Sequence, residues 1–132
     1  MNVILKVVMC LVLVTPILGA TGVFPPPTPD LYNTPEAFAF IEALMATGYL
    51  TYLITIVFAA AIAAIATKRT ALGALLVLPV TVNIVSFHLF LDGGLLTGGA
   101  VLANVLLVLN LYFLWQSRRQ YVALSEKEAV VR

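Results

Sequence analysis

ALGALLVLPVTVNIVSFHLFLDGGLLTGGAVLANVLLVLNLYFLW, residues 71–115, is the stretch that decides the fold of this chain. Two long apolar runs flank the glycine-rich segment DGGLLTGG, residues 92–99, and each run is long enough to cross the hydrocarbon core of a bilayer as a helix. The glycines indicate a turn between the two runs. The stretch therefore predicts two antiparallel membrane-spanning helices, at 71–91 and 99–116.

The composition indicates a membrane protein throughout. Of the 132 residues, 62% are hydrophobic and 10% are charged, whereas roughly half of a soluble domain is apolar. A chain of this length forms one domain, residues 1–132. The net charge of +1 gives no reason to expect nucleic acid as a partner, and the lone Cys10 indicates a buried, inert thiol.

Two further spans precede the central stretch. The first is predicted at 5–24, because no charged residue occurs from 7 to 24. The alternative is a cleaved signal peptide ending at the small residues Gly19 and Ala20. Leu18 argues against it, because it occupies a position where a cleavage site normally has a second small residue. The next span is predicted at 49–67, and its closing segment AAAIAAIAT favours close approach of another helix.

Residues 25–48 are predicted to lie outside the hydrocarbon, between the first two spans. The segment FPPPTPDLYNT, residues 24–34, is rich in proline and favours an extended loop. Thr34 is suited to cap a helix that has Pro35 at its first position and Glu36 in its first turn. We expect a short helix here, which lies at the membrane surface or leads obliquely into the next span, and a polar cytoplasmic tail at 117–132.

The charges predict the orientation in the membrane. With four spans and a cytoplasmic N-terminus, every basic residue falls on the inside and the outer segments carry only acidic residues, as the positive-inside rule requires. We therefore predict both termini in the cytoplasm. The basic residues are Lys6, Lys68, Arg69, Arg118, Arg119, Lys127 and Arg132, and the outer acidic residues are Asp30, Glu36, Glu42 and Asp92.

Polar side chains inside the spans are the candidates for function, because such groups are costly in hydrocarbon. Asn83 and Asn104 are predicted at similar depths, about 18 Å from the cytoplasmic side at 1.5 Å per residue, so a contact between their amides is expected. The alternative role is contact with a ligand such as a quinone. Asn110 is the third asparagine within an apolar run.

The only histidine, His88, is predicted near the outer surface with Asp92 one helical turn beyond it. The pair favours a hydrogen-bonded interface histidine, and the functional alternatives are a proton-transferring group beside a quinone or a cofactor ligand. Phe87 and Phe90 are expected to form apolar walls around the imidazole. One histidine and one cysteine do not supply a metal set or a bis-histidine haem, so neither a metal nor a haem is expected within one subunit.

Absent motifs restrict the enzyme classes. The chain has no Ser/His/Asp set and no glycine-rich phosphate loop, and no catalytic residue is assigned. The first two spans contain no acid of the kind that small four-span drug exporters use to carry protons.

Three segments together resemble the DoxX-like family of small bacterial membrane proteins: ATGYL (46–50), LLVLPVTVNIVSFHLFLD (75–92) and LNLYFLWQSRRQY (109–121). The resemblance implies a four-helix bundle in the bacterial inner membrane, and relatives include a subunit of a thiosulfate:quinone oxidoreductase. The polar positions that it implies are Asn83, His88, Asp92, Asn110 and Tyr112.

The chain departs from the family pattern in the second span. Thr55 and Phe58 stand where a lysine and a glutamate are expected, which removes an ion pair suited to redox or proton chemistry. Three functions therefore stay open: an accessory or scaffold subunit with a protein partner or a second copy, a membrane subunit of a quinone-linked oxidoreductase, and a pathway for protons or a small solute.

Overall fold

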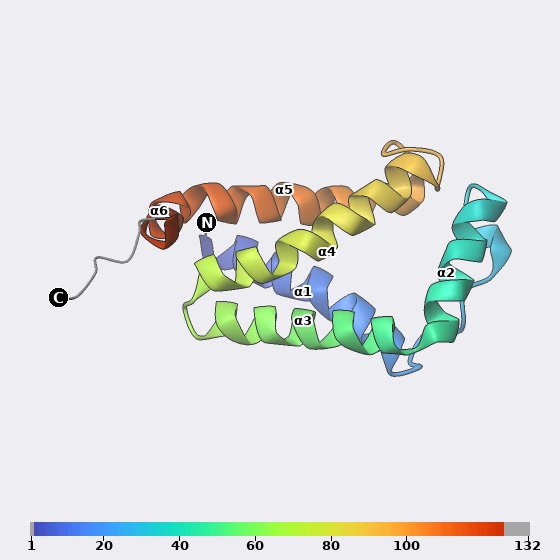
Figure 1. Cartoon of the computed structure of the whole chain (residues 1–132), viewed down its shortest axis with the longest axis horizontal. Helices are drawn as coiled ribbons and strands as arrows, with labels where there is room; N and C mark the ends of the chain where they lie inside the picture. The colour runs from blue at the N-terminus through green and yellow to red at the C-terminus, as the bar shows by residue number, and fades with distance from the viewer. Residues whose placement is uncertain (1, 126–132) are drawn as a thin grey trace.

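The structure, a computed structural model, describes residues 2–125 and is built from helices joined by short connections. Four helices in this range are long and apolar enough to cross a membrane, and they run side by side as a bundle (Figure 1). The predicted all-α, four-helix membrane bundle is confirmed. These helices are α1 (Asn2–Ala20), α3 (Tyr49–Ala66), α4 (Thr70–Phe90) and α5 (Val101–Gln116), the last preceded by the 3₁₀ turn η2 (Gly98–Ala100).

The helix ends agree with the predicted spans except in α1. The later spans were predicted at 49–67, 71–91 and 99–116 and are found at 49–66, 70–90 and 98–116. The first was predicted to continue to residue 24, but α1 ends at Ala20. Gly22 has a φ of 77°, which lies outside the helical region, so the chain leaves the helix before the prolines begin.

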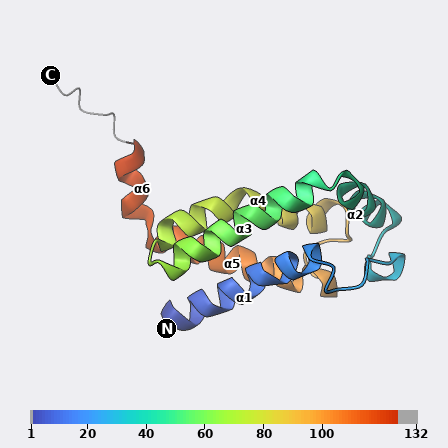
Figure 2. The same ribbon diagram turned by 90° about the horizontal axis from the view of Figure 1, so that it is seen from below.

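A short helix, α2 (Pro35–Thr47), follows the 3₁₀ turn η1 (Pro29–Leu31) and lies across one end of the bundle (Figures 1 and 2). Its start is as predicted: Thr34 is the N-cap and accepts a hydrogen bond from the amide of Ala37 at 3.1 Å, and Pro35 occupies the first turn. Gly48, with a φ of 67°, joins α2 directly to α3. The chain therefore turns from the end of the bundle into the second span without a loop.

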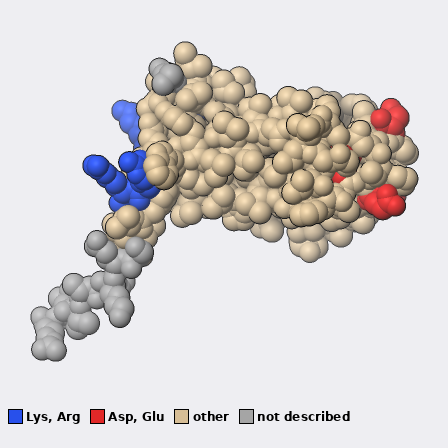
Figure 3. Space-filling model, turned by 90° about the horizontal axis from the view of Figure 1, so that it is seen from above, with Lys and Arg blue, Asp and Glu red and all other residues tan. Residues whose placement is uncertain are grey.

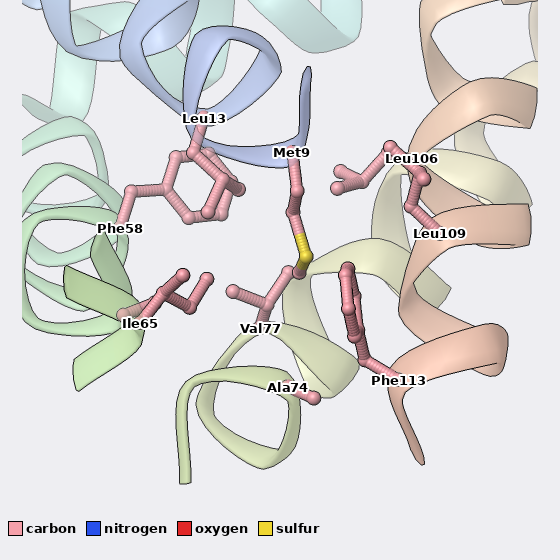
Figure 4. Close-up of a cluster of buried hydrophobic side chains, with 10 residues drawn as sticks. Met9, Leu13, Phe58, Ile65, Ala74, Val77, Leu106, Leu109 and Phe113 are labelled. Carbon is pink, nitrogen blue, oxygen red and sulfur yellow. The ribbon is translucent and has the colours of Figure 1, made fainter. Parts of the chain in front are cut away.

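The core lies where all four spanning helices meet (Figure 4). Met9 and Leu13 of α1, Phe58 of α3, Val77 of α4 and Phe113 of α5 are each 0% exposed. Because lipid tails are as apolar as these side chains, the contacts stabilise the bundle through close packing rather than through removal of water.

Small residues bring α3 and α4 unusually close together. A Cβ on Gly73 would lie 2.8 Å from Cγ1 of Ile65 and 3.0 Å from the carbonyl oxygen of Ala61. Ala61 and Ala64 are buried. The small-residue segment at the end of the second span therefore serves the predicted helix contact.

Charge is divided between the two ends of the bundle, and the sides are apolar. Figure 3 shows Lys and Arg side chains at one end and Asp and Glu at the other. We call these the basic end and the acidic end. Large apolar side chains cover the surface between them, including Ile56 and Val108 at 65% and 66% exposed. The chain is therefore a multi-pass integral membrane protein whose apolar sides suit contact with a lipid bilayer.

Part of the predicted polar tail is helical. α6 (Arg118–Ser125) turns away from α5 at the basic end (Figure 2). The Tyr121 hydroxyl donates a 2.7 Å hydrogen bond to the carbonyl of Ala71, and partial burial raises the pKa of this phenol. The Arg118 guanidinium lies 4.6 Å above the Trp115 ring. The remainder of the predicted tail, 126–132, lies outside the described residues.

Candidate functional site

The predicted contact between His88 and Asp92 is present at the acidic end. Nδ1 of His88 lies 2.9 Å from Oδ2 of Asp92, one turn later in the chain. The Asp92 side chain is 2% exposed and that of His88 13% exposed. A carboxylate so deeply buried needs several hydrogen bonds to offset its loss of water.

Asn33 supplies those bonds from a segment 59 residues away in the sequence. Its backbone amide donates to Oδ1 of Asp92 at 2.8 Å, and its side-chain Nδ2 donates to the carbonyl of Asp92 at 3.1 Å. Nδ2 also lies 3.3 Å from Oδ1. Asp92 therefore joins the end of α4 to the loop that precedes α2.

Thr34 completes this connection. Its hydroxyl donates to the carbonyl of Leu91 while it caps α2. We call the five residues Asn33, Thr34, His88, Leu91 and Asp92 the loop joint. The sequence gives no sign of the role of Asn33 and indicates only the capping role of Thr34, since no local pattern links residues so distant in the chain.

Aromatic rings enclose the imidazole side of the joint. The Phe87 ring lies 5.1 Å from that of His88, 5.7 Å from Phe40 and 6.3 Å from Tyr32, measured between centroids. Burial, and secondarily the negative charge of Asp92, raises the pKa of the Tyr32 phenol. Phe87 forms the predicted apolar wall. The same prediction for Phe90 is wrong, because that ring is 78% exposed and points away from the bundle.

Gly99 closes the opposite side of the joint. A Cβ at this position would lie 3.4 Å from Oδ2 of Asp92 and 3.7 Å from Cε1 of His88. The α4–α5 connection therefore packs against the His88–Asp92 contact. Both oxygens of the Asp92 carboxylate therefore contact protein groups, which favours a structural role for this side chain.

The expected contact between Asn83 and Asn104 is wrong. Asn104 donates from Nδ2 to the carbonyl of Leu95 at 2.7 Å, within the connection that leads into its own helix. Asn83 instead faces outward from α4 and is exposed. The positions of Asn83 and Asn104 in the sequence indicate similar depths in the membrane. They do not indicate the direction in which each side chain points from its helix axis.

Asn110 is a fully buried contact between α4 and α5. Its Nδ2 donates to the carbonyl of Ala74 at 2.8 Å, and its Oδ1 has no hydrogen-bond partner among the described residues. Tyr112, also in α5, donates from its hydroxyl to Oδ1 of Asn2 at 2.8 Å and so ties α5 to the start of α1. Both side chains hold helices together.

The larger of two described cavities lies near the acidic end, apart from His88. It measures about 750 Å³, is open on one side, and is lined by the end of α1, the proline-rich loop, α2 and the start of α3. Thr55 lines it, with its hydroxyl bonded to the carbonyl of Thr51 at 2.8 Å. Phe58 lies in the core instead. The two positions that the family resemblance associates with an ion pair are thus a cavity wall and a core contact.

The second cavity, about 360 Å³, lies at the basic end beside Lys68 and Arg69.

Within residues 2–125, no three His, Cys, Asp or Glu side chains lie close enough to hold a metal ion. Comparison with protein-family models, with curated proteins and with solved structures gives no match for this chain. The DoxX-like resemblance therefore stays a prediction from the three quoted segments.

Proposed function

We propose that this protein is an accessory or scaffold subunit of a complex in the bacterial inner membrane, as the DoxX-like resemblance implies, with its basic end in the cytoplasm. The proposal rests on the hydrogen bonds of the loop joint. His88 and Asp92, which are candidates for function by sequence, lie in a network that fixes a loop to the bundle. Asn104 and Asn110 are likewise bonded to backbone carbonyls.

The test is recovery of the complex from membranes. A tagged chain is extracted with its surrounding lipid by an amphipathic polymer, and copurifying proteins are identified by mass spectrometry. We expect a discrete membrane protein in near-equal amount, retained by folded His88→Ala protein. Recovery of the chain without any such protein, or loss of the partner only in the folded His88→Ala variant, would contradict a scaffold role.

A second candidate, a quinone-linked subunit, is supported by the larger cavity. Its volume of about 750 Å³ falls in the range of small-molecule sites, and its wall is mainly apolar. The hydroxyl-bearing residues in this wall are Tyr32, Thr51, Tyr52 and Thr55. Quinone bound here would lie away from His88, because His88 does not line this cavity.

Filling the cavity separates the two candidates. Thr55→Phe should remove copurifying quinone if this cavity holds it, whereas the matched change Val108→Phe on the lipid-exposed side of α5 should not. Quinone is quantified by absorbance after solvent extraction of the purified protein. A quinone content near zero in the wild-type protein would eliminate this second candidate.

A further inference from the structure

Asn83 is a polar side chain exposed in the apolar part of a membrane helix. It lies about 20 Å along the axis from Thr70 and about 10 Å from Phe90, at about 1.5 Å per residue. Its side-chain amide makes no hydrogen bond to any of residues 2–125. An amide in hydrocarbon loses its bonds to water and requires a replacement partner.

Asn83 lies in the middle of a mostly exposed stripe of α4. The stripe has members at spacings of three and four residues, which is the pattern that lets a second helix pack along the first. All are exposed except Ser86, which is half-buried. We call this stripe the α4 lipid face, and its residues are Leu72, Leu75, Pro79, Asn83, Ser86 and Phe90.

A second copy of this chain has a group that matches the unpaired amide of Asn83. Because basic and acidic residues lie at opposite ends, every copy is expected to have the same orientation in the membrane. Two such copies related by an axis along the membrane normal bring the same residue to the same depth. The Asn side chain carries both a donor and an acceptor, so two Asn83 amides at one depth satisfy each other. We propose that two copies pair through the α4 lipid face with their Asn83 amides hydrogen-bonded.

The pairing is independent of the accessory role. The α4 lipid face is separate from the loop joint and from the larger cavity, and α4 also contacts α3 and α5. Leu72 and Leu75, at the basic end of this face, line the smaller cavity beside α6. A partner of different sequence would need its own polar group at the depth of Asn83. A second copy meets this requirement without any further condition.

Disulfide cross-linking tests the geometry. In a Cys10→Ala background, Ser86→Cys places a thiol on the α4 lipid face, and Val108→Cys places a control thiol on exposed α5. The purified variants are oxidised with copper phenanthroline in phosphatidylcholine vesicles. We expect a disulfide-linked dimer with Ser86→Cys and little with Val108→Cys. Equal cross-linking at the two positions would overturn the proposal, as would cross-linking in native membranes only to a protein of different mass.

Replacing the amide tests its role in pairing. Asn83→Leu should weaken dimerisation roughly three- to tenfold, within the range found for the loss of an interhelical polar contact in lipid. Energy transfer between labelled copies, followed as vesicle lipid is increased, gives the dissociation constant. Val108→Leu is the matched control, and the melting temperature of diluted monomer should not fall because Asn83 makes no internal bond. An unchanged dissociation constant in folded Asn83→Leu protein would overturn the proposal.

Discussion

Individual polar residues in this bundle act mainly by joining segments that are distant in the chain. Asp92 is the clearest example, since one carboxylate accepts bonds from the Asn33 amide and contacts His88 while 1% of the residue is exposed. Its charge is tolerated because donors surround it.

Replacing Asp92 by alanine should therefore lower the free energy of unfolding by about 1–3 kcal/mol, because it leaves the backbone amide of Asn33 without an acceptor and removes the contact with His88. Nδ2 of Asn33 keeps the backbone carbonyl of residue 92 as its acceptor. The same change should make the loop at 24–34 more sensitive to protease. Thermal unfolding in detergent micelles measures the first effect. Glu42→Ala, an exposed change at the same end, is the control and should alter stability little.

Unlike the loss of Asp92, the loss of the polar group of Asn110 is expected to change stability little. Its Nδ2 makes one hydrogen bond, but its buried Oδ1 makes none with the described residues. Asn110→Leu removes the unsatisfied oxygen and keeps the same branching and number of side-chain heavy atoms, so we expect a stability change of less than about 1 kcal/mol. Asn110→Asp should cost several times more, because it buries a charge. Comparable melting temperatures for the two variants would contradict this account.

At the scale of elements, the contact between α3 and α4 depends on the absence of a side chain at Gly73. A Cβ there meets the Ala61 carbonyl oxygen, which is backbone and cannot move aside as a side-chain end can. The helices must separate to accept even a methyl group.

Gly73→Ala should therefore destabilise the bundle by about 1–3 kcal/mol, the usual range for overpacking. Gly98→Ala is the matched control, because no atom lies within 4 Å of a Cβ at that position and its φ is not positive. Thermal unfolding of the two purified variants measures the difference. A larger loss of stability for the control would show that the close contact does not limit packing.

For the whole molecule, the division of charge between the two ends predicts the orientation in the membrane. In a Cys10→Ala background, Thr28→Cys near the acidic end should react with a membrane-impermeant maleimide in intact cells. Ala123→Cys in α6 should react only after the membrane is permeabilised. Reaction of Ala123→Cys in intact cells would invert the proposed topology.

The sequence alone determined the class, the four spans and the start of α2. These features follow from apolar runs, prolines and capping residues, whose effects act over a few neighbouring residues. The contact of His88 with Asp92 could also be predicted, because residues four apart are neighbours on any helix.

Only the tertiary structure decided which way the other polar side chains face. It turned Asn83 outward, bonded Asn104 to its own connection and brought Asn33 to Asp92 across 59 residues of sequence. In spans that are apolar all round, hydrophobic periodicity does not identify the inner side of a helix. Rotation of each helix about its axis is fixed by contacts such as Gly73 against Ala61, which exist only after the helices have packed.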